Sequence, residues 1–284
     1  MISLVATSVA LAETATRADC DISEEDLCVY QEKEGDHIAI FARNRKAFEI
    51  SVELQFWLRN MHLAEPDKNQ FVVSANSEQK LATLVITDPY ARSGMQYSYW
   101  WVPGDFNAKH DGKSLYRLPY KLGSTFYVGQ SCNSTGTHQG SHARNAIDFV
   151  LPVGTPVHAA RGGTVVDLHE VSNSGGLSTM HYDKGNFVQI KHADGTIASY
   201  HHLRTMGVKV DLGEHVEAGD FIAYSGDTGY SSGPHLHFVV LQPESPRKTN
   251  SISVTWMAAR GELTCPRAGL ALRAVSIPEQ GAND

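Results

Sequence analysis

Beyond its first dozen residues, the sequence lacks any apolar run approaching the ~20 residues that a membrane-spanning helix needs. It also lacks an excess of basic residues: 24 Lys and Arg stand against 31 Asp and Glu, giving a net charge of −7. This balance argues against nucleic acid or an acidic lipid surface as a partner. Charged residues are only 19% of the chain and hydrophobic residues 42%, which excludes a disordered chain and predicts buried cores. At 284 residues, we expect about two domains.

Cysteine is scarce. The chain has four cysteines and no C-x-x-C pair, which argues against a zinc site built from cysteines. An even number suits disulfide bonds in an oxidising compartment. Cys20 and Cys28 are close enough in sequence to close a small loop. Cys132 and Cys265 would then tie the start of the second domain to the C-terminal tail, and we predict both disulfides.

The first residues resemble an export signal. Residues 1–12 are apolar and small, and they end in Ala10-Leu11-Ala12, which has the A-x-A form of a signal-peptidase site. A positively charged leader is missing from this stretch. We therefore expect a signal peptide over residues 1–12 and an exported protein, either periplasmic or secreted.

Long amphipathic helical patterns are also missing, and short β-rich runs separated by turns recur instead. In residues 50–56, Ile50, Val52 and Leu54 alternate with polar residues, as in a strand with one buried face. Such runs predict an all-β fold that begins with a β-sandwich-like accessory domain over residues 20–108, followed by a linker over 109–127. Aromatic residues in one of its runs could stack on a sugar, although packing is their commoner role: Tyr97, Tyr99, Trp100 and Trp101.

Histidine is abundant, and it is concentrated in the second half. Of 14 histidines, 11 lie between His138 and His237. The segment Ser231–Phe238 contains an H-x-H pair that leads into an apolar strand. Alternate side chains of a strand share a face, so His235 and His237 should lie side by side. Imidazoles held this way suit a metal site.

A catalytic zinc site has three protein ligands as a rule, so others must come from elsewhere in the chain. His138 and Asp148 are the obvious suppliers. Asp148 stands between Ile147 and Phe149, and a carboxylate in so apolar a run needs a metal or a cation as partner. We therefore expect these residues to meet the H-x-H strand.

The second half resembles the lysostaphin-type (LytM-like) zinc endopeptidases, which cut peptidoglycan peptides. The resemblance covers about residues 128 to 242, and its motifs recur in order along the chain. The matching segments are 137–140, 146–149, 152–157, 162–165, 186–192, 194–195, 200–203 and 231–238. It implies a LytM-like antiparallel β-sheet metallopeptidase domain over residues 128–255, with a C-terminal tail over 256–284.

By the same resemblance, one Zn²⁺ per chain would be bound by His138, Asp148 and His237. His235, and His202 of the Tyr-x-His-Leu motif, would act on the attacking water and on the developing oxyanion. The adjacent His201 should face the opposite side of its strand, at the surface or behind the ligands. The implied function is hydrolysis of peptide bonds in peptidoglycan cross-links or stem peptides, with zinc-activated water as nucleophile.

Two questions stay open at this point. Nine residues separate His138 from Asp148, whereas family members commonly have three, and His142 leaves five. His142 is therefore an alternative first ligand, although His138 retains the His-x-Gly pattern. The polar loop 171–184 is long enough to overhang the site, and either it or the first domain could block it.

Other functions share parts of this pattern. A non-enzymatic regulator of another cell-wall hydrolase, with a protein partner of its own, would fit a chain that had lost a ligand, and none is lost here. A secreted peptidase acting on Gly-rich proteins would need the same site. Pure carbohydrate binding would explain the aromatic residues but not the ordered histidines.

Overall fold

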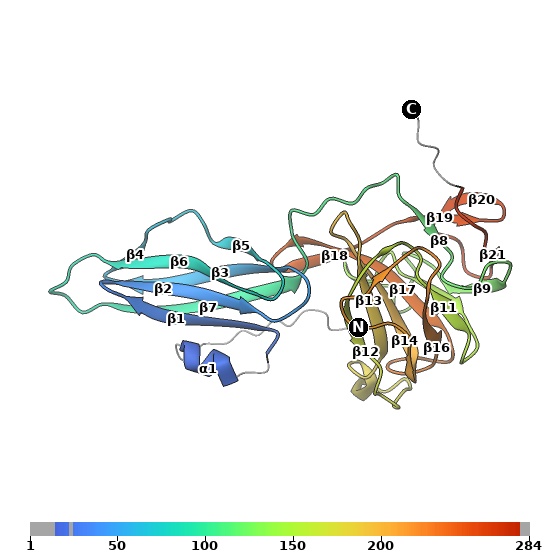
Figure 1. Cartoon of the computed structure of the whole chain (residues 1–284), viewed down its shortest axis with the longest axis horizontal. Helices are drawn as coiled ribbons and strands as arrows, with labels where there is room; N and C mark the ends of the chain where they lie inside the picture. Colours follow the sequence, from blue (N-terminus) through green and yellow to red (C-terminus); the bar gives the residue numbers. More distant parts are fainter. Residues whose placement is uncertain (1–14, 23–24, 279–284) are drawn as a thin grey trace. The chain divides into compact units, whose positions relative to one another are not determined.

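The computed structural model describes residues 15–22 and 25–278, and these residues divide into two compact units (Figure 1). One unit consists of residues 4–107, as far as they are described, together with 243–249. The larger unit consists of residues 108–242 together with 250 to the end of the described chain. The predicted signal peptide, residues 1–12, lies outside the described residues.

The N-terminal unit is built from two antiparallel sheets and one short helix. Sheet order is β1-β2-β6-β4 in the first and β5-β3-β7 in the second. The elements are α1 (Arg17–Ile22), β1 (Leu27–Glu34), β2 (His37–Asn44), β3 (Ile50–Arg59), β4 (Met61–Leu63), β5 (Gln70–Val73), β6 (Ser77–Ile86) and β7 (Gly94–Pro103).

Alternation along β3 buries one face of the strand, as the sequence predicted. Ile50, Val52 and Leu54 are almost inaccessible to solvent. The aromatic residues of β7 serve packing: Tyr97, Tyr99 and Trp101 are buried, and Trp100 lies 3.4 Å below the guanidinium of Arg247. No aromatic platform for a sugar is needed to explain them.

The larger unit is organised around an 11-stranded sheet. Its main path is β15-β12-β13-β14-β17-β10-β9-β21; β16 pairs with β11 and β14, and β18 pairs with β17. The elements are β9 (Thr125–Gln130), β10 (Ile147–Val150), β11 (Pro156–His158), β12 (Gly163–His169), η1 (Thr179–His181), β13 (Asn186–Lys191), β14 (Ile197–Val208), β15 (His215–Val216), β16 (Phe221–Ser225), β17 (Leu236–Ser245), β18 (Lys248–Ile252) and β21 (Ala271–Arg273). A second sheet has the order β20-β19-β8, from β8 (Leu115–Arg117), β19 (Thr255–Ala258) and β20 (Gly261–Thr264).

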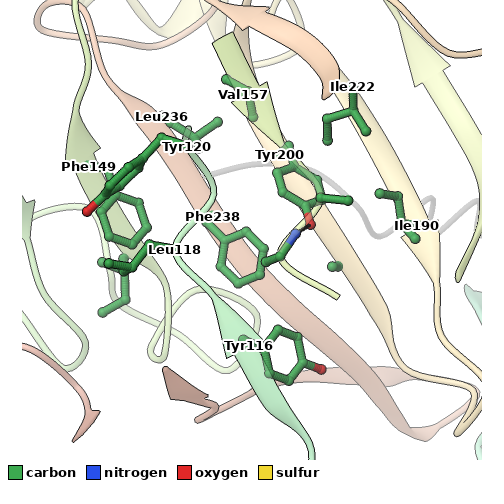
Figure 2. Packing of buried hydrophobic residues seen from close by; sticks show 14 of the residues in the cluster. Tyr116, Leu118, Tyr120, Phe149, Val157, Ile190, Tyr200, Ile222, Leu236 and Phe238 are labelled. Atoms are coloured by element: carbon green, nitrogen blue, oxygen red, sulfur yellow. Dashed lines mark hydrogen bonds between the residues drawn. The ribbon is translucent and has the colours of Figure 1, made fainter. Parts of the chain in front are cut away.

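One face of the central strands forms the core of this unit (Figure 2). Tyr200 of β14 pairs with Phe238 of β17, and their rings pack edge to face at 5.1 Å. The next pair in the same register is His201 with His237. Because side chains alternate along a strand, the aromatic pair fills the core while the histidine pair takes the other face.

Residues of the predicted linker, 109–127, and of the predicted C-terminal tail, 256–284, contribute to this core. The sequence had placed both stretches outside the domain. Tyr116, Leu118 and Tyr120 are fully buried, and so is Trp256. Trp256 of β19 pairs with Tyr116 of β8 in parallel register. Single buried residues in short strands have little periodicity, so their burial depends on the partner strand and was not visible in the sequence.

Both predicted disulfides are present. Cys20–Cys28 fastens α1 to β1 beside the buried Tyr30, and Cys132–Cys265 joins the segment after β9 to the segment after β20. Among residues 15–22 and 25–278, no helix has the length and apolar character to cross a membrane.

The disulfide Cys132–Cys265 closes a loop with a sequence separation of 133 residues. We expect Cys132→Ala/Cys265→Ala to destabilise the larger unit by about 2–5 kcal/mol, because the unfolded chain regains the freedom of that loop. Calorimetric unfolding of the double variant measures this. Cys20→Ala/Cys28→Ala, whose separation is 8, is the control and should leave the transition of the larger unit in place. Equal effects of both double variants on that transition would contradict the prediction that the Cys132–Cys265 disulfide in particular stabilises the larger unit.

A second prediction concerns His192, which is buried and donates from Nδ1 to the Gly162 carbonyl at 2.8 Å. Burial lowers the pKa of His192 to about 4, from an ordinary value of 6.5. Between these values the unfolded state binds a proton that the folded state does not, so the free energy of unfolding should fall as pH drops from about 6.5 to 4. The contribution is of the order of 3 kcal/mol.

Denaturant unfolding at a series of pH values checks this. His192→Asn retains a donor for the Gly162 carbonyl but does not titrate, so its stability should vary less across this window than that of the parent chain. His215→Asn, at an exposed position, is the matched control and should keep the parent slope. An unchanged slope in His192→Asn would refute the prediction.

Candidate metal centre

Three side chains that could bind a metal converge on one face of the large sheet. Antiparallel pairing of β10 with β17 places Asp148 directly opposite His237. His138 approaches from the loop between β9 and β10. His138 Nε2 lies 3.1 Å from Asp148 Oδ1 and 3.3 Å from His237 Nδ1, and the last two atoms are 2.8 Å apart. All three residues are buried.

The three residues fit a divalent cation. His138 donates from Nδ1 to the Ser131 carbonyl at 2.8 Å, so a neutral His138 presents the lone pair of Nε2 to the group. The other nitrogen of His237, Nε2, is buried without a hydrogen-bond partner. Two imidazole nitrogens and one carboxylate oxygen that point at a common centre form the ligand set that zinc prefers.

Electrostatics at this cluster favour an ionised carboxylate beside His138. Burial acts to lower the pKa of His138, but its hydrogen bond with Asp148 and the charge of Asp148 outweigh burial and raise it. Burial acts to raise the pKa of Asp148, but hydrogen bonds from His138 and His237 outweigh it and hold the pKa well below its usual range. Burial lowers the pKa of His237, against the opposing pull of Asp148. Metal ligands must be deprotonated to bind, so the directions at Asp148 and His237 suit a cation site, and a cation there must displace any proton that Asp148 holds on Nε2 of His138.

His202 and His235 lie beside the three residues, with their ring centroids 4.5 Å apart. His202 donates from Nδ1 to the Thr228 carbonyl at 2.7 Å, and His235 donates from Nδ1 to the Gly233 carbonyl at 2.8 Å. In the neutral form each ring therefore keeps a lone pair on Nε2. His235 Nε2 is 3.9 Å from Asp148 Oδ2, which places this nitrogen at the cluster.

The prediction that His201 and His202 face opposite sides of their strand was wrong. Phe187 pairs with His201 and Asn186 with Leu203, so His202 is an extra residue in β14 and forms a β-bulge with φ 62°. Both rings therefore lie near His237, with centroid distances of 5.8 Å for His201 and 6.0 Å for His202. A left-handed residue other than glycine costs about 1–3 kcal/mol and persists only where the surrounding structure holds it.

The sequence left His201 either at the surface or behind the ligands, and the structure places it beside His237. The His201 ring is buried, and its Nε2 lies 2.6 Å from Ser199 Oγ. The alternative ligand His142 is half-buried, and it does not join the converging group among the described residues. Burial lowers the pKa of His142. The structure thus brings His138, and not His142, to Asp148 and His237.

Loop 171–184 is fastened to the turn that precedes His235. Gly229 donates its N–H to the Ser174 carbonyl at 2.8 Å, and Gly176 donates to the Gly229 carbonyl at 3.0 Å. A Cβ atom on Gly175 would lie only 2.2 Å from the Asp227 carbonyl oxygen, so this approach requires glycine. The contact could not be foreseen from the loop's composition.

We expect His138→Ala to reduce Zn²⁺ affinity by more than about 100-fold, because it removes one of three converging donors. Competition with a chromophoric chelator measures the affinity directly. His142→Ala is the matched control, since it removes an imidazole from the same loop without removing a member of the group, and should change affinity by less than about 3-fold. The reverse result would make His142 the ligand.

Part of this chain is similar to known peptidases. Residues 142–250 match the family model described as peptidase family M23. The glycyl-glycine endopeptidase ALE-1 of Staphylococcus capitis is 38% identical over 119 residues, which are 42% of this chain and 27% of that protein. The peptidoglycan DD-endopeptidase ShyA of Vibrio cholerae serotype O1 is 35% identical over 109 residues, which are 37% of this chain and 23% of that protein.

Among solved structures, the catalytic domain of lysostaphin from Staphylococcus simulans is 30% identical; the match covers 52% of this chain and 84% of that one, with a TM-score of 0.28. The chain spans about a quarter of the length of the curated relatives it matches. The family match covers the strands that carry Asp148, His202 and His237. Residues 142–250 therefore form a peptidase family M23 domain that is similar to the lysostaphin-type (LytM-like) metalloendopeptidases.

Proposed function

We propose that this chain is a zinc-dependent endopeptidase that hydrolyses peptide bonds in peptidoglycan, with one Zn²⁺ held by His138, Asp148 and His237. The observation that carries the proposal is the convergence of these three donors beside two further histidines, His202 and His235. Zn²⁺ in such a site supplies Lewis acidity, which polarises a scissile carbonyl and lowers the pKa of a water molecule towards ~7.

His202 and His235 are the residues that handle protons in this proposal. Both rings have Nδ1–H committed to a backbone carbonyl, so Nε2 is the atom left to meet water or substrate. A neutral imidazole with a bare Nε2 can accept a proton from the attacking water. A ring that carries a proton on both nitrogens can donate to the oxyanion that develops on the carbonyl. We assign these two tasks to this pair.

The proposed substrate class follows from the family and from the relatives named above. ALE-1 is a glycyl-glycine endopeptidase and ShyA a peptidoglycan DD-endopeptidase, so the relatives cut different bonds. Both are endopeptidases, and the peptidoglycan named for ShyA supports the substrate class that we propose. Two disulfides suit an exported protein, and we propose the periplasm or the cell exterior as its location.

The test is digestion of purified sacculi by the zinc-loaded chain, with released fragments identified by mass spectrometry and a chelator as control. We expect chelator-sensitive release of shorter or uncross-linked muropeptides, and their masses name the bond. Gly-rich protein substrates run in parallel would reveal a protein peptidase instead. Bound zinc without release from any substrate would favour the regulatory alternative.

Variants separate the two groups of residues. His237→Ala or Asp148→Ala should lose both zinc and activity. His235→Ala should retain most zinc while turnover falls by roughly 10²–10⁴-fold, because only proton handling is removed. His215→Ala, at an exposed position, should match the parent chain in both measurements. Equal zinc loss in all three site variants would overturn the division between ligands and proton-handling residues.

A further inference from the structure

The turn between β16 and β17 holds both proton-handling histidines. An isolated bridge between Gly226 and His235 closes this turn. Within it, the Thr228 carbonyl accepts from His202 and the Gly233 carbonyl accepts from His235. Whatever fixes this turn therefore fixes the direction in which both rings present Nε2.

A buried hydroxyl lies at the centre of the turn. Ser231 is only 5% exposed, and its Oγ is 2.6 Å from the Asp227 carboxylate oxygen Oδ1. The single hydroxyl hydrogen has two acceptors within reach, this carboxylate and the Gly233 carbonyl, and we assign it to the carboxylate because a charge-assisted bond at this distance is the stronger one. The Gly233 carbonyl oxygen lies 2.8 Å from the same Oγ.

The oxygen of this hydroxyl also accepts hydrogen bonds from residues that follow it in the chain. Ser231 Oγ accepts the N–H of Gly233 at 3.2 Å and lies 3.3 Å from His235 Nδ1. Nδ1–H of His235 is thus shared between the Gly233 carbonyl and the Ser231 hydroxyl. The contacts run in one line from the Asp227 carboxylate through Ser231 to the imidazole of His235.

We propose that Ser231 and Asp227 are positioning residues for His235: they hold the proton on Nδ1 and leave Nε2 directed at the substrate. The role in turnover rests on the proposed function, because it requires His235 to act on water or substrate. The hydrogen-bonded line itself does not depend on that function. Metal binding is separate, because the hydrogen bonds of these two residues in the described structure do not involve His138, Asp148 or His237.

Removal of the Ser231 hydroxyl should weaken the positioning of the His235 ring without reducing the affinity for zinc. In Ser231→Ala the carboxylate of Asp227 loses its donor, Gly233 loses the acceptor for its N–H, and Nδ1 of His235 loses one of two acceptors. We expect kcat to fall roughly 10–100-fold, the range found when partners that orient functional histidines are removed. KM should stay within about 2-fold, because no contact with substrate is removed.

The experiment compares four variants by steady-state kinetics, zinc affinity and thermal unfolding. Ser231→Thr retains a hydroxyl and should keep kcat within about 3-fold of the parent chain, while Asp227→Asn loses only the charge and should fall between the parent and Ser231→Ala. Ser232→Ala removes an exposed hydroxyl one residue further along the turn and is the matched control, with parent kinetics expected. Zinc affinity should be unchanged in all four.

A second readout tests the line of contacts even if the parent chain cleaves no substrate offered. In ¹⁵N spectra of the imidazoles, His235 of the parent chain should carry its proton on Nδ1, and Ser231→Ala should shift it towards a mixture of tautomers. Parent kcat and parent His235 signals in Ser231→Ala would overturn the proposal. So would a fall in kcat accompanied by an equal fall in zinc affinity, because that would locate the defect in the metal site.

Discussion

The antiparallel pairing of β10 with β17 is the constraint on which the rest of the site depends. It sets Asp148 opposite His237, Phe149 opposite Leu236 and Ile147 opposite Phe238. The polar pair faces the site and the apolar pairs enclose it from the core side. A slip of one residue would carry Asp148 into the core and Phe149 to the site, at a large cost in both places. The hydrophobic core therefore fixes the register that brings the three donors together.

Backbone carbonyls orient the histidine rings that the strand register brings together. Ser131, Thr228 and Gly233 each accept a hydrogen bond from Nδ1 of a different histidine: His138, His202 and His235 respectively. The carbonyl of a fixed turn is a more rigid partner than a side chain, so each ring is held in one tautomer and one orientation. In the neutral form each of the three rings keeps a lone pair on Nε2, and this arrangement suits the cation binding and proton transfer that we propose.

Local irregularity at the site is supported by close packing around it. The left-handed residue His202 would be unfavourable in isolation, and the β-bulge persists because Asn186 and Leu203 pair beyond it. Loop 171–184 adds a second support: it hydrogen bonds to the backbone of Gly229, inside the turn that holds His202 and His235. A loop that could have been a mobile cover is, in this structure, fastened to the positioning turn.

The sequence alone predicted the all-β class, the pairing of four cysteines and a cluster of Asp148 and His237 with a third ligand, for which His142 stayed open beside His138. These inferences rested on patterns formed by residues close together in the sequence: alternation along one strand, the H-x-H pair, and the carboxylate of Asp148 in an apolar run. The resemblance to a known family indicated which histidines and which aspartate would bind the metal. The roles of the individual residues remain predictions.

Tertiary structure decided the rest. Only the extra residue in β14 shows that His201 and His202 both lie near His237, because a bulge depends on the register of the neighbouring strand and leaves no periodic signal. Tyr116 and Trp256 enter the core through pairing of β8 with β19, two short strands far apart in the sequence. The line from Asp227 through Ser231 to His235 likewise depends on how a turn closes. Such contacts are set by three-dimensional packing, which a one-dimensional pattern does not encode.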